Sequence, residues 1–99
     1  MIRIQAARNP GGTTITIAID GQLVSEYVEE VETSIRNATE QQKRVQLFLR
    51  DVSHIDEAGH SLLSRLAAQG VELTAAGLYS SYVVAQVQHA PGFRHSRGK

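Results

Sequence analysis

Residues 45–63 read VQLFLRDVSHIDEAGHSLL, and the change of pattern within them decides the fold. The opening run is short and rich in Val, Leu and Phe, so we expect a central strand over residues 43–50, covered on both faces. Apolar positions at helical spacing follow: Ala58, Leu62, Leu63 and Leu66. They predict a helix that ends at Gly70, and the charged segment HIDEAGH, residues 54–60, should form the loop between strand and helix.

The preceding residues predict a β-hairpin and a helix. Apolar and polar residues alternate on each side of the turn signal NPGG at residues 9–12, which predicts two strands with one buried face. The apolar positions of that face are Ile2, Ile4, Ala6, Ile15, Ile17 and Ile19. Apolar residues then recur every three or four positions over residues 25–39, and glutamates crowd the first half, so we expect a helix with Ser25 as its N-cap.

The residues after the second helix predict a short strand over residues 71–75, a turn at Ala76 and Gly77, and a third, less regular helix. The order β-β-α-β-α-β-α predicts an α/β fold with a single domain. Its mixed sheet should have about four strands, with an antiparallel N-terminal hairpin and parallel crossovers, and helices should back it. We place the domain at residues 1–90 and a basic C-terminal tail at residues 91–99.

The composition excludes several kinds of chemistry and partner. The chain has 99 residues with ten basic and ten acidic side chains, so neither nucleic acid nor an anionic membrane is favoured as a partner. It has no cysteine, which excludes disulfides and thiolate chemistry. No segment approaches the roughly 18 apolar residues that a spanning helix needs, and the N-terminus lacks an apolar signal region. We therefore expect a soluble cytoplasmic protein without direct membrane insertion, and the sequence leaves its oligomeric state open.

The charged segment contains residue types that suit a metal site, since His54, Asp56 and His60 are possible zinc ligands. No further ligand cluster exists elsewhere in the chain, so we expect no metal and no other cofactor. A hydrolase would pair Ser53 or Ser61 with a histidine, but neighbouring residues at a helix start point in different directions, and no G-x-S-x-G elbow is present. We therefore expect no catalytic residue, and Asp56 is best explained as the N-cap of the second helix.

The strand VQLFLRDVSHID, the helix start EAGHSLLSRL and the last strand GVELTAAG resemble the STAS domain, the fold of anti-sigma factor antagonists. The most specific part is Ile55, Asp56 and Gly59, followed by the pair Leu62 and Leu63, within this order of strands and helices. The resemblance covers nearly the whole chain. In that family the residue after the aspartate is commonly a serine that a partner kinase, itself the anti-sigma factor, phosphorylates. The unphosphorylated antagonist binds the kinase and releases the sigma factor, and phosphorylation ends the binding.

This sequence departs from the family at that position, because Glu57 stands where the phosphoacceptor would be and Ala58 replaces the second serine often found beside it. Glutamate keeps one negative charge over the helix N-terminus, so it resembles phosphoserine only in part. The resemblance then implies a non-enzymatic, protein-binding regulatory module that is not controlled by phosphorylation at the usual position. An ordinary acidic residue in a first helical turn is an equally open interpretation of Glu57, and Ser53 and Ser61 are candidates for displaced phosphoacceptors.

The resemblance implies two kinds of protein partner. One is an anti-sigma factor of the serine-kinase type, and the alternative is the ATPase subunit of an ABC or anion transport system that uses a soluble STAS accessory subunit. Gly59 should permit a close backbone approach, Asp56 should cap the helix, and Glu57 should set the charge that a partner reads. We expect the partner-binding residues to be His54, Asp56, Glu57, Ala58, Gly59, His60 and Ser61.

Overall fold

The computed structural model describes residues 2–41 and 44–88, which fold around one four-stranded sheet. The elements are β1 (Ile2–Arg8), β2 (Thr14–Leu23), α1 (Ser25–Gln41), β3 (Arg44–Ile55), α2 (Glu57–Ala68), β4 (Glu72–Ala75) and α3 (Leu78–Gln88). The strand order is β1-β2-β3-β4; β1 pairs antiparallel with β2, and the other two pairs are parallel. The predicted α/β fold, with its antiparallel hairpin and parallel crossovers, is confirmed.

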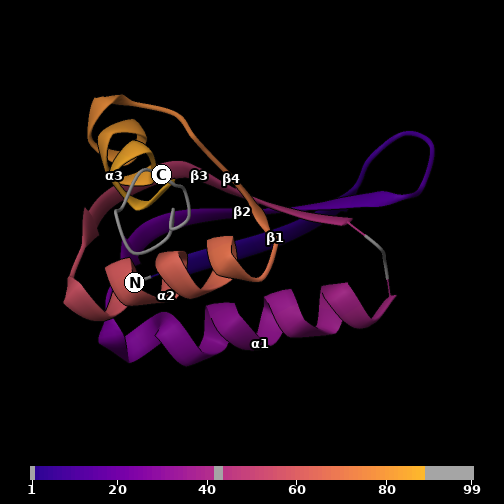
Figure 1. The fold of residues 1–99 in the computed structure, drawn as a ribbon, viewed down its shortest axis with the longest axis horizontal. Helices are drawn as coiled ribbons and strands as arrows, with labels where there is room; N and C mark the ends of the chain where they lie inside the picture. Colours follow the sequence, from indigo (N-terminus) through magenta and orange to yellow (C-terminus); the bar gives the residue numbers. More distant parts are fainter. Residues whose placement is uncertain (1, 42–43, 89–99) are drawn as a thin grey trace, which may run out of the picture.

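The core lies between one face of the sheet and the helices that cover it. Figure 1 shows α1 and α2 side by side along that face, and α3 packs against α2, β3 and β4. The most completely buried apolar side chains come from every layer: Ile17, Ile19, Leu23, Val31, Leu47, Leu49, Leu62, Leu63, Leu66 and Val87. Because burying a side chain of this size contributes about 1.5–3 kcal/mol, these contacts hold the helices on the sheet.

β3 continues to Ile55, rather than ending near residue 50, because two bulges interrupt its alternation. The register against β2 shifts after Leu49 and again after Val52, so Arg50 and Ser53 are extra residues without an opposite partner. In a regular strand every second side chain is buried. At each bulge the next buried side chain follows after three positions instead of two. The buried residues of β3 are accordingly Val45, Leu47, Leu49, Val52 and Ile55.

The charged segment HIDEAGH is therefore not a loop, which corrects the expectation from the sequence. His54 and Ile55 end β3, Glu57 begins α2, and only Asp56 lies between strand and helix. The loss of period-two alternation after Leu49 has the same appearance in a sequence as the end of a strand, and the bulges cause it. Strand and helix thus meet at a single residue.

Three smaller expectations differ as well. On the edge strand β1, Ala6 is exposed, whereas Ile2 and Ile4 are half-buried against the core, so most of the buried hairpin face comes from β2. Ser25 is the first residue of α1 and not the cap before it. α1 ends at Gln41, two positions beyond the predicted end. The predicted tail at residues 91–99 lies outside the described residues.

α3 completes the hydrogen bonding of β3 beyond the short strand β4. β4 pairs with β3 only as far as Leu49. Farther along β3, the buried Ser80 hydroxyl donates to the Val52 carbonyl at 3.2 Å, and the Tyr79 hydroxyl accepts the Ile55 N–H at 2.9 Å. Side chains of a helix thus take the place of a neighbouring strand along this edge.

Replacing Tyr79 by Phe removes the hydroxyl that accepts the Ile55 N–H. We expect Tyr79→Phe to lower the free energy of unfolding by about 1–3 kcal/mol, measured by urea denaturation, because the N–H loses its partner beside α3. Tyr82→Phe is the matched control on the same helix, since the Tyr82 hydroxyl is exposed and bonds the Gln86 amide at 3.3 Å. The control should change stability by less than about 0.5 kcal/mol. Equal effects of the two substitutions would contradict the assigned role of Tyr79.

Candidate functional site

Asp56 joins the starts of two neighbouring helices. Its Oδ1 accepts the backbone N–H of Gly59 at 2.8 Å, which is the N-cap bond of α2 that the sequence predicts. Its Oδ2 accepts the N–H of Ser25 at 3.0 Å, so the same carboxylate also serves the first residue of α1. N–H groups at a helix start carry partial positive charge, and one ionised carboxylate here satisfies two of them from different helices.

These hydrogen bonds favour the ionised form of Asp56. The N–H of Gly59 is the largest cause that lowers the pKa of this carboxyl from its usual value, and the N–H of Ser25 is the next. Desolvation opposes the shift, while His54 nearby adds to it. The charge that links the two helices is therefore present throughout the neutral pH range.

Gly59 is buried at the point where α2 meets the end of β2. A Cβ atom at this position would lie 2.2 Å from the carbonyl oxygen of Leu23 and 3.1 Å from Cγ2 of Ile55. The first distance is far shorter than the separation at which non-bonded atoms attract. The close backbone approach expected of Gly59 is therefore an approach within the chain, and Gly59 itself faces inward.

The outward side of the first turns of α2 carries Glu57, His60 and Ser61, whose spacing of three and four residues places them on one helical face. Glu57 and Ser61 are exposed, and His60 is half-buried. Glu57 is the first residue of α2, which agrees with the helix start EAGH of the family resemblance and not with a loop over residues 54–60. Because Asp56 accepts the N–H of Gly59, the carboxylate of Glu57 is not needed for the cap.

The remaining predicted residues lie beside this face. His54 is exposed near the end of β3, and Ala58 is half-buried in the first turn of α2. The structure therefore brings the predicted set together at one end of the sheet, except that Gly59 lies beneath it. We call the outer set the α2-start surface: His54, Asp56, Glu57, Ala58, His60 and Ser61.

The backbone N–H of Ser25 contributes to this region through a contact with Asp56 that the sequence did not predict. Ser25 lies 31 positions before Asp56, and their hydrogen bond depends on the parallel pairing that places the ends of β2 and β3 side by side. A sequence signal for an N-cap identifies only the helix that directly follows it. The expectation of an aspartate cap was therefore confirmed for α2, and its second bond was missed.

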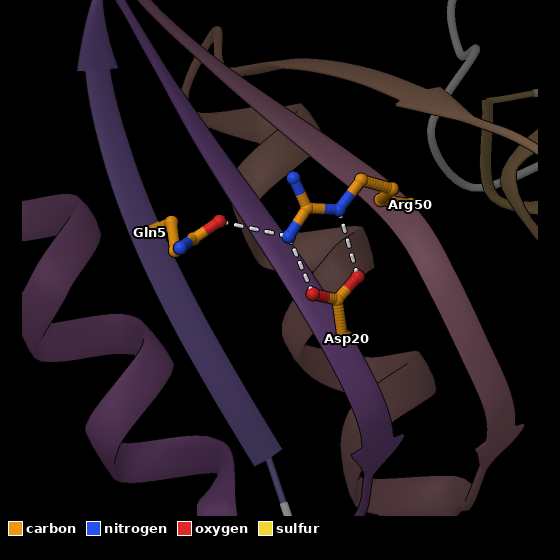
Figure 2. Close-up of polar contacts among 3 residues, drawn as sticks. All are labelled: Gln5, Asp20 and Arg50. Carbon is orange, nitrogen blue, oxygen red and sulfur yellow. Dashed lines mark hydrogen bonds and ion pairs between the residues drawn. The ribbon is translucent and has the colours of Figure 1, made fainter.

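A second polar cluster lies on the sheet and was also missed. Figure 2 shows Arg50 of β3 reaching across β2 to Asp20 and on to Gln5 of β1. Arg50 Nε donates to Asp20 Oδ1 at 2.9 Å, and its Nη2 donates to Gln5 Oε1 at 2.8 Å. The bond from Arg50 is the main cause that lowers the pKa of Asp20. An open hollow of about 660 Å³ adjoins the cluster and is lined by Arg3, Asp20, Gly21, Arg50, Asp51 and Ser53.

The candidates for metal binding and hydrolysis do not assemble within the described residues. There, no three His, Asp or Glu side chains come together as a group that could hold a metal ion. The Ser53 hydroxyl donates to the Gly21 carbonyl at 3.4 Å, and no hydrogen bond joins Ser53 or Ser61 to a histidine in the part of the chain that the structure describes.

Two solved structures share this arrangement of strands and helices. One is an antisigma-factor antagonist, a STAS domain from Rhodobacter sphaeroides, which is 17% identical with a TM-score of 0.58 over 81% of this chain and 90% of that chain. The other is an uncharacterised protein with a SpoIIAA-like fold from Shewanella loihica, 12% identical with a TM-score of 0.60 over 88% of this chain and 76% of that chain. No protein-family model and no curated protein matches the sequence.

The chain is thus a STAS-like domain in its fold, which confirms the resemblance predicted from the sequence. At these identities the likeness establishes the fold, and it does not transfer the roles of individual residues. None of the helices in the described residues combines the length and apolar character needed to cross a bilayer.

The Leu23 contact determines the expected effect of changing Gly59. Alanine is the better helix former by about 1 kcal/mol, so propensity alone would make Gly59→Ala stabilising. The 2.2 Å approach to the Leu23 carbonyl reverses this expectation, and we expect a net loss of about 1–3 kcal/mol in the free energy of unfolding. Ser64→Ala, at an exposed position of the same helix, is the control and should be neutral to slightly stabilising. A stabilising Gly59→Ala would contradict the close contact.

The lowered pKa of Asp56 predicts a change in acid stability. Because the folded-state pKa lies below the unfolded value of about 3.9, the ionised cap stabilises the fold above about pH 4, and this contribution is lost as the pH falls through the folded-state pKa. Asp56→Asn keeps an accepting oxygen but has no charge to lose. The urea midpoint of the wild type should therefore fall more steeply below about pH 4 than that of Asp56→Asn.

The control for this titration is Asp51→Asn, which removes an exposed carboxylate from β3. This substitution removes one negative charge near the end of β3 and leaves both hydrogen bonds of Asp56 in place. Parallel curves for the wild type and Asp56→Asn would contradict the assignment of a charged double cap to Asp56.

Proposed function

We propose that this protein is a non-enzymatic, cytoplasmic regulatory module that binds another protein through the α2-start surface. The observation that carries the proposal is an exposed carboxylate, that of Glu57, on the first residue of α2 in a STAS-like fold. In this proposal Glu57 supplies a permanent negative charge at the position that corresponds to the phosphoacceptor of the family.

The division of roles between Asp56 and Glu57 supports this function. Asp56 holds the N–H groups of Gly59 and Ser25 and is thereby committed to the fold. Glu57 lies one position farther on, at the positive end of the α2 dipole, and its charge faces solvent. A partner with a basic group can therefore contact Glu57 without disturbing the cap.

The neighbouring side chains support a protein partner more than a small ligand. His54, Glu57 and Ser61 are exposed and His60 is half-buried, so the start of α2 presents several polar groups to solvent. Small ligands bind in concave apolar pockets, whereas charged groups at the rim of a protein interface set partner choice. The exposed polar and charged groups of the α2-start surface are those of a protein interface, which supports a protein partner.

The experiment is affinity capture with the purified domain, followed by measurement of binding to the captured protein. We expect the partner to be an ATPase of the serine-kinase type that acts as an anti-sigma factor. Glu57→Gln should weaken that binding about tenfold or more, which corresponds to about 1.4 kcal/mol, because it removes only the charge. Glu40→Gln, at an exposed position near the other end of α1, is the control and should bind like the wild type.

Three outcomes would count against this proposal or redirect it. Equal affinity of Glu57→Gln and the wild type would show that the charge of Glu57 does not contribute to binding and that Glu57 is an ordinary residue of a first helical turn. Recovery of an ABC or anion-transport ATPase subunit would support the alternative, a soluble accessory subunit of a transporter. Stoichiometric phosphate on Ser53 or Ser61 after incubation with the kinase and ATP would show that phosphorylation control persists at a displaced position.

A further inference from the structure

β1 forms an edge of the sheet, and no strand of the described residues pairs with its outer side. The backbone groups on that side of a seven-residue strand are a template for another strand. Ile2 and Ile4 are only half-buried there, although both pack against the core. β1 therefore presents unpaired backbone together with incompletely covered apolar side chains.

A groove runs between β1 and α1 on the helix side of the sheet. It has a volume of about 440 Å³, and Ile4 and Ala6 form its wall on β1, while Glu30, Ser34 and Asn37 form its wall on α1. Glu30 also borders an adjoining hollow with Glu26 and Glu29. The groove is thus apolar along the strand, and the hollow that adjoins it at Glu30 is acidic along the first half of the helix.

This edge of the chain carries exposed side chains of both charges, basic on β1 and acidic on α1. Arg8 is exposed at the end of β1, and Glu26, Glu29 and Glu30 are exposed along α1. Within the described residues none of these four side chains forms an ion pair, whereas Glu32, on the other side of α1, pairs with an arginine of α2. Glu30, which lines the groove against β1, and its neighbours Glu26 and Glu29 thus have no cationic partner in the described part of their own chain.

We propose that β1 pairs antiparallel with β1 of a second copy of this chain, around a two-fold axis at Gln5. Antiparallel pairing around this axis places Ile2 opposite Arg8 and Ile4 opposite Ala6, and it includes all seven residues of each strand. Shifting the axis by one residue along the strand leaves residues of both copies unpaired. Two four-stranded sheets become one continuous sheet of eight strands.

This register places Arg8 of the second copy beside the acidic half of α1. Arg8 and the side chains of Ile2 and Ile4 lie on the same side of β1, since strand side chains alternate, and that is the side of the groove. Ile2 pairs with Gly21 of β2, four positions before α1 begins, so the residue opposite Ile2 lies near the start of α1. Arg8 of each copy therefore meets the glutamates of the other, and the pairing is self-complementary.

The dimer leaves the α2-start surface open. The two sides of α1 are distinct, because Glu32 and Arg36 line a hollow with Leu66 of α2, whereas Glu30 and Ser34 line the groove against β1. Self-association along β1 and binding of a partner at α2 thus use opposite sides of the helix pair. The two proposals can fail independently.

The test measures molar mass by light scattering after size-exclusion chromatography over a range of concentrations. The wild type should approach twice the monomer mass of 10.8 kDa. Arg8→Glu and Glu30→Arg should each weaken the dimer by about tenfold or more, because each places like charges together. The double variant should recover association, since opposite charges face each other again. Glu72→Arg on the other edge strand is the control and should associate like the wild type.

Circular dichroism of each variant establishes that the fold is retained, which is expected because the exchanged side chains are exposed. A wild type that keeps the monomer mass at every concentration would overturn the proposal. The unpaired side of β1 would then be a candidate for pairing with a strand of another protein. A dimer that is insensitive to both single reversals would also overturn it, because the contact would lie elsewhere. Loss of association in the single variants without recovery in the double variant would reject the pairing of Arg8 with the acidic side of α1.

Discussion

The two hydrogen bonds accepted by Asp56 are the constraint that sets how the starts of α1 and α2 lie together at the end of the sheet. Parallel strands bring their carboxyl ends to the same edge of a sheet, so α1 and α2 begin next to each other with N–H groups that the helices cannot satisfy. One carboxylate placed between them bonds Ser25 of the first helix and Gly59 of the second. The absence of a side chain at Gly59 lets the second helix lie close enough to β2 for this geometry.

Most of the fold could be predicted from the sequence, because a strand or helix with one buried face has apolar residues at regular intervals. The alternation in the hairpin and the helical stripe around Leu62 and Leu63 each reflect one buried face, and the order of elements then restricts the topology. The extra residues Arg50 and Ser53 could not be predicted, because a bulge erases the period that identifies a strand. The strand therefore continued into the segment where a loop was expected.

The candidate site was predictable to the extent that it is local. An aspartate before an apolar helical stripe signals a cap, and Glu57 one residue later must then lie in the first turn. Contacts between segments distant in the sequence, such as that of Asp56 with Ser25 or of Arg50 with Asp20, depend on strand register. No pattern within either segment contains that register. The inward position of Gly59 likewise became evident only with Leu23 beside it.

The separation of the structural carboxylate from the outer one has a consequence for how such a domain diversifies. Since the carboxylate of Asp56 already accepts the Gly59 N–H, the side chain of residue 57 is not needed for the cap, and its charge can change in a single mutational step. A serine, a glutamate or a neutral residue can occupy it on an unchanged scaffold. The charge at this position can therefore change during divergence without passing through an unstable ancestor.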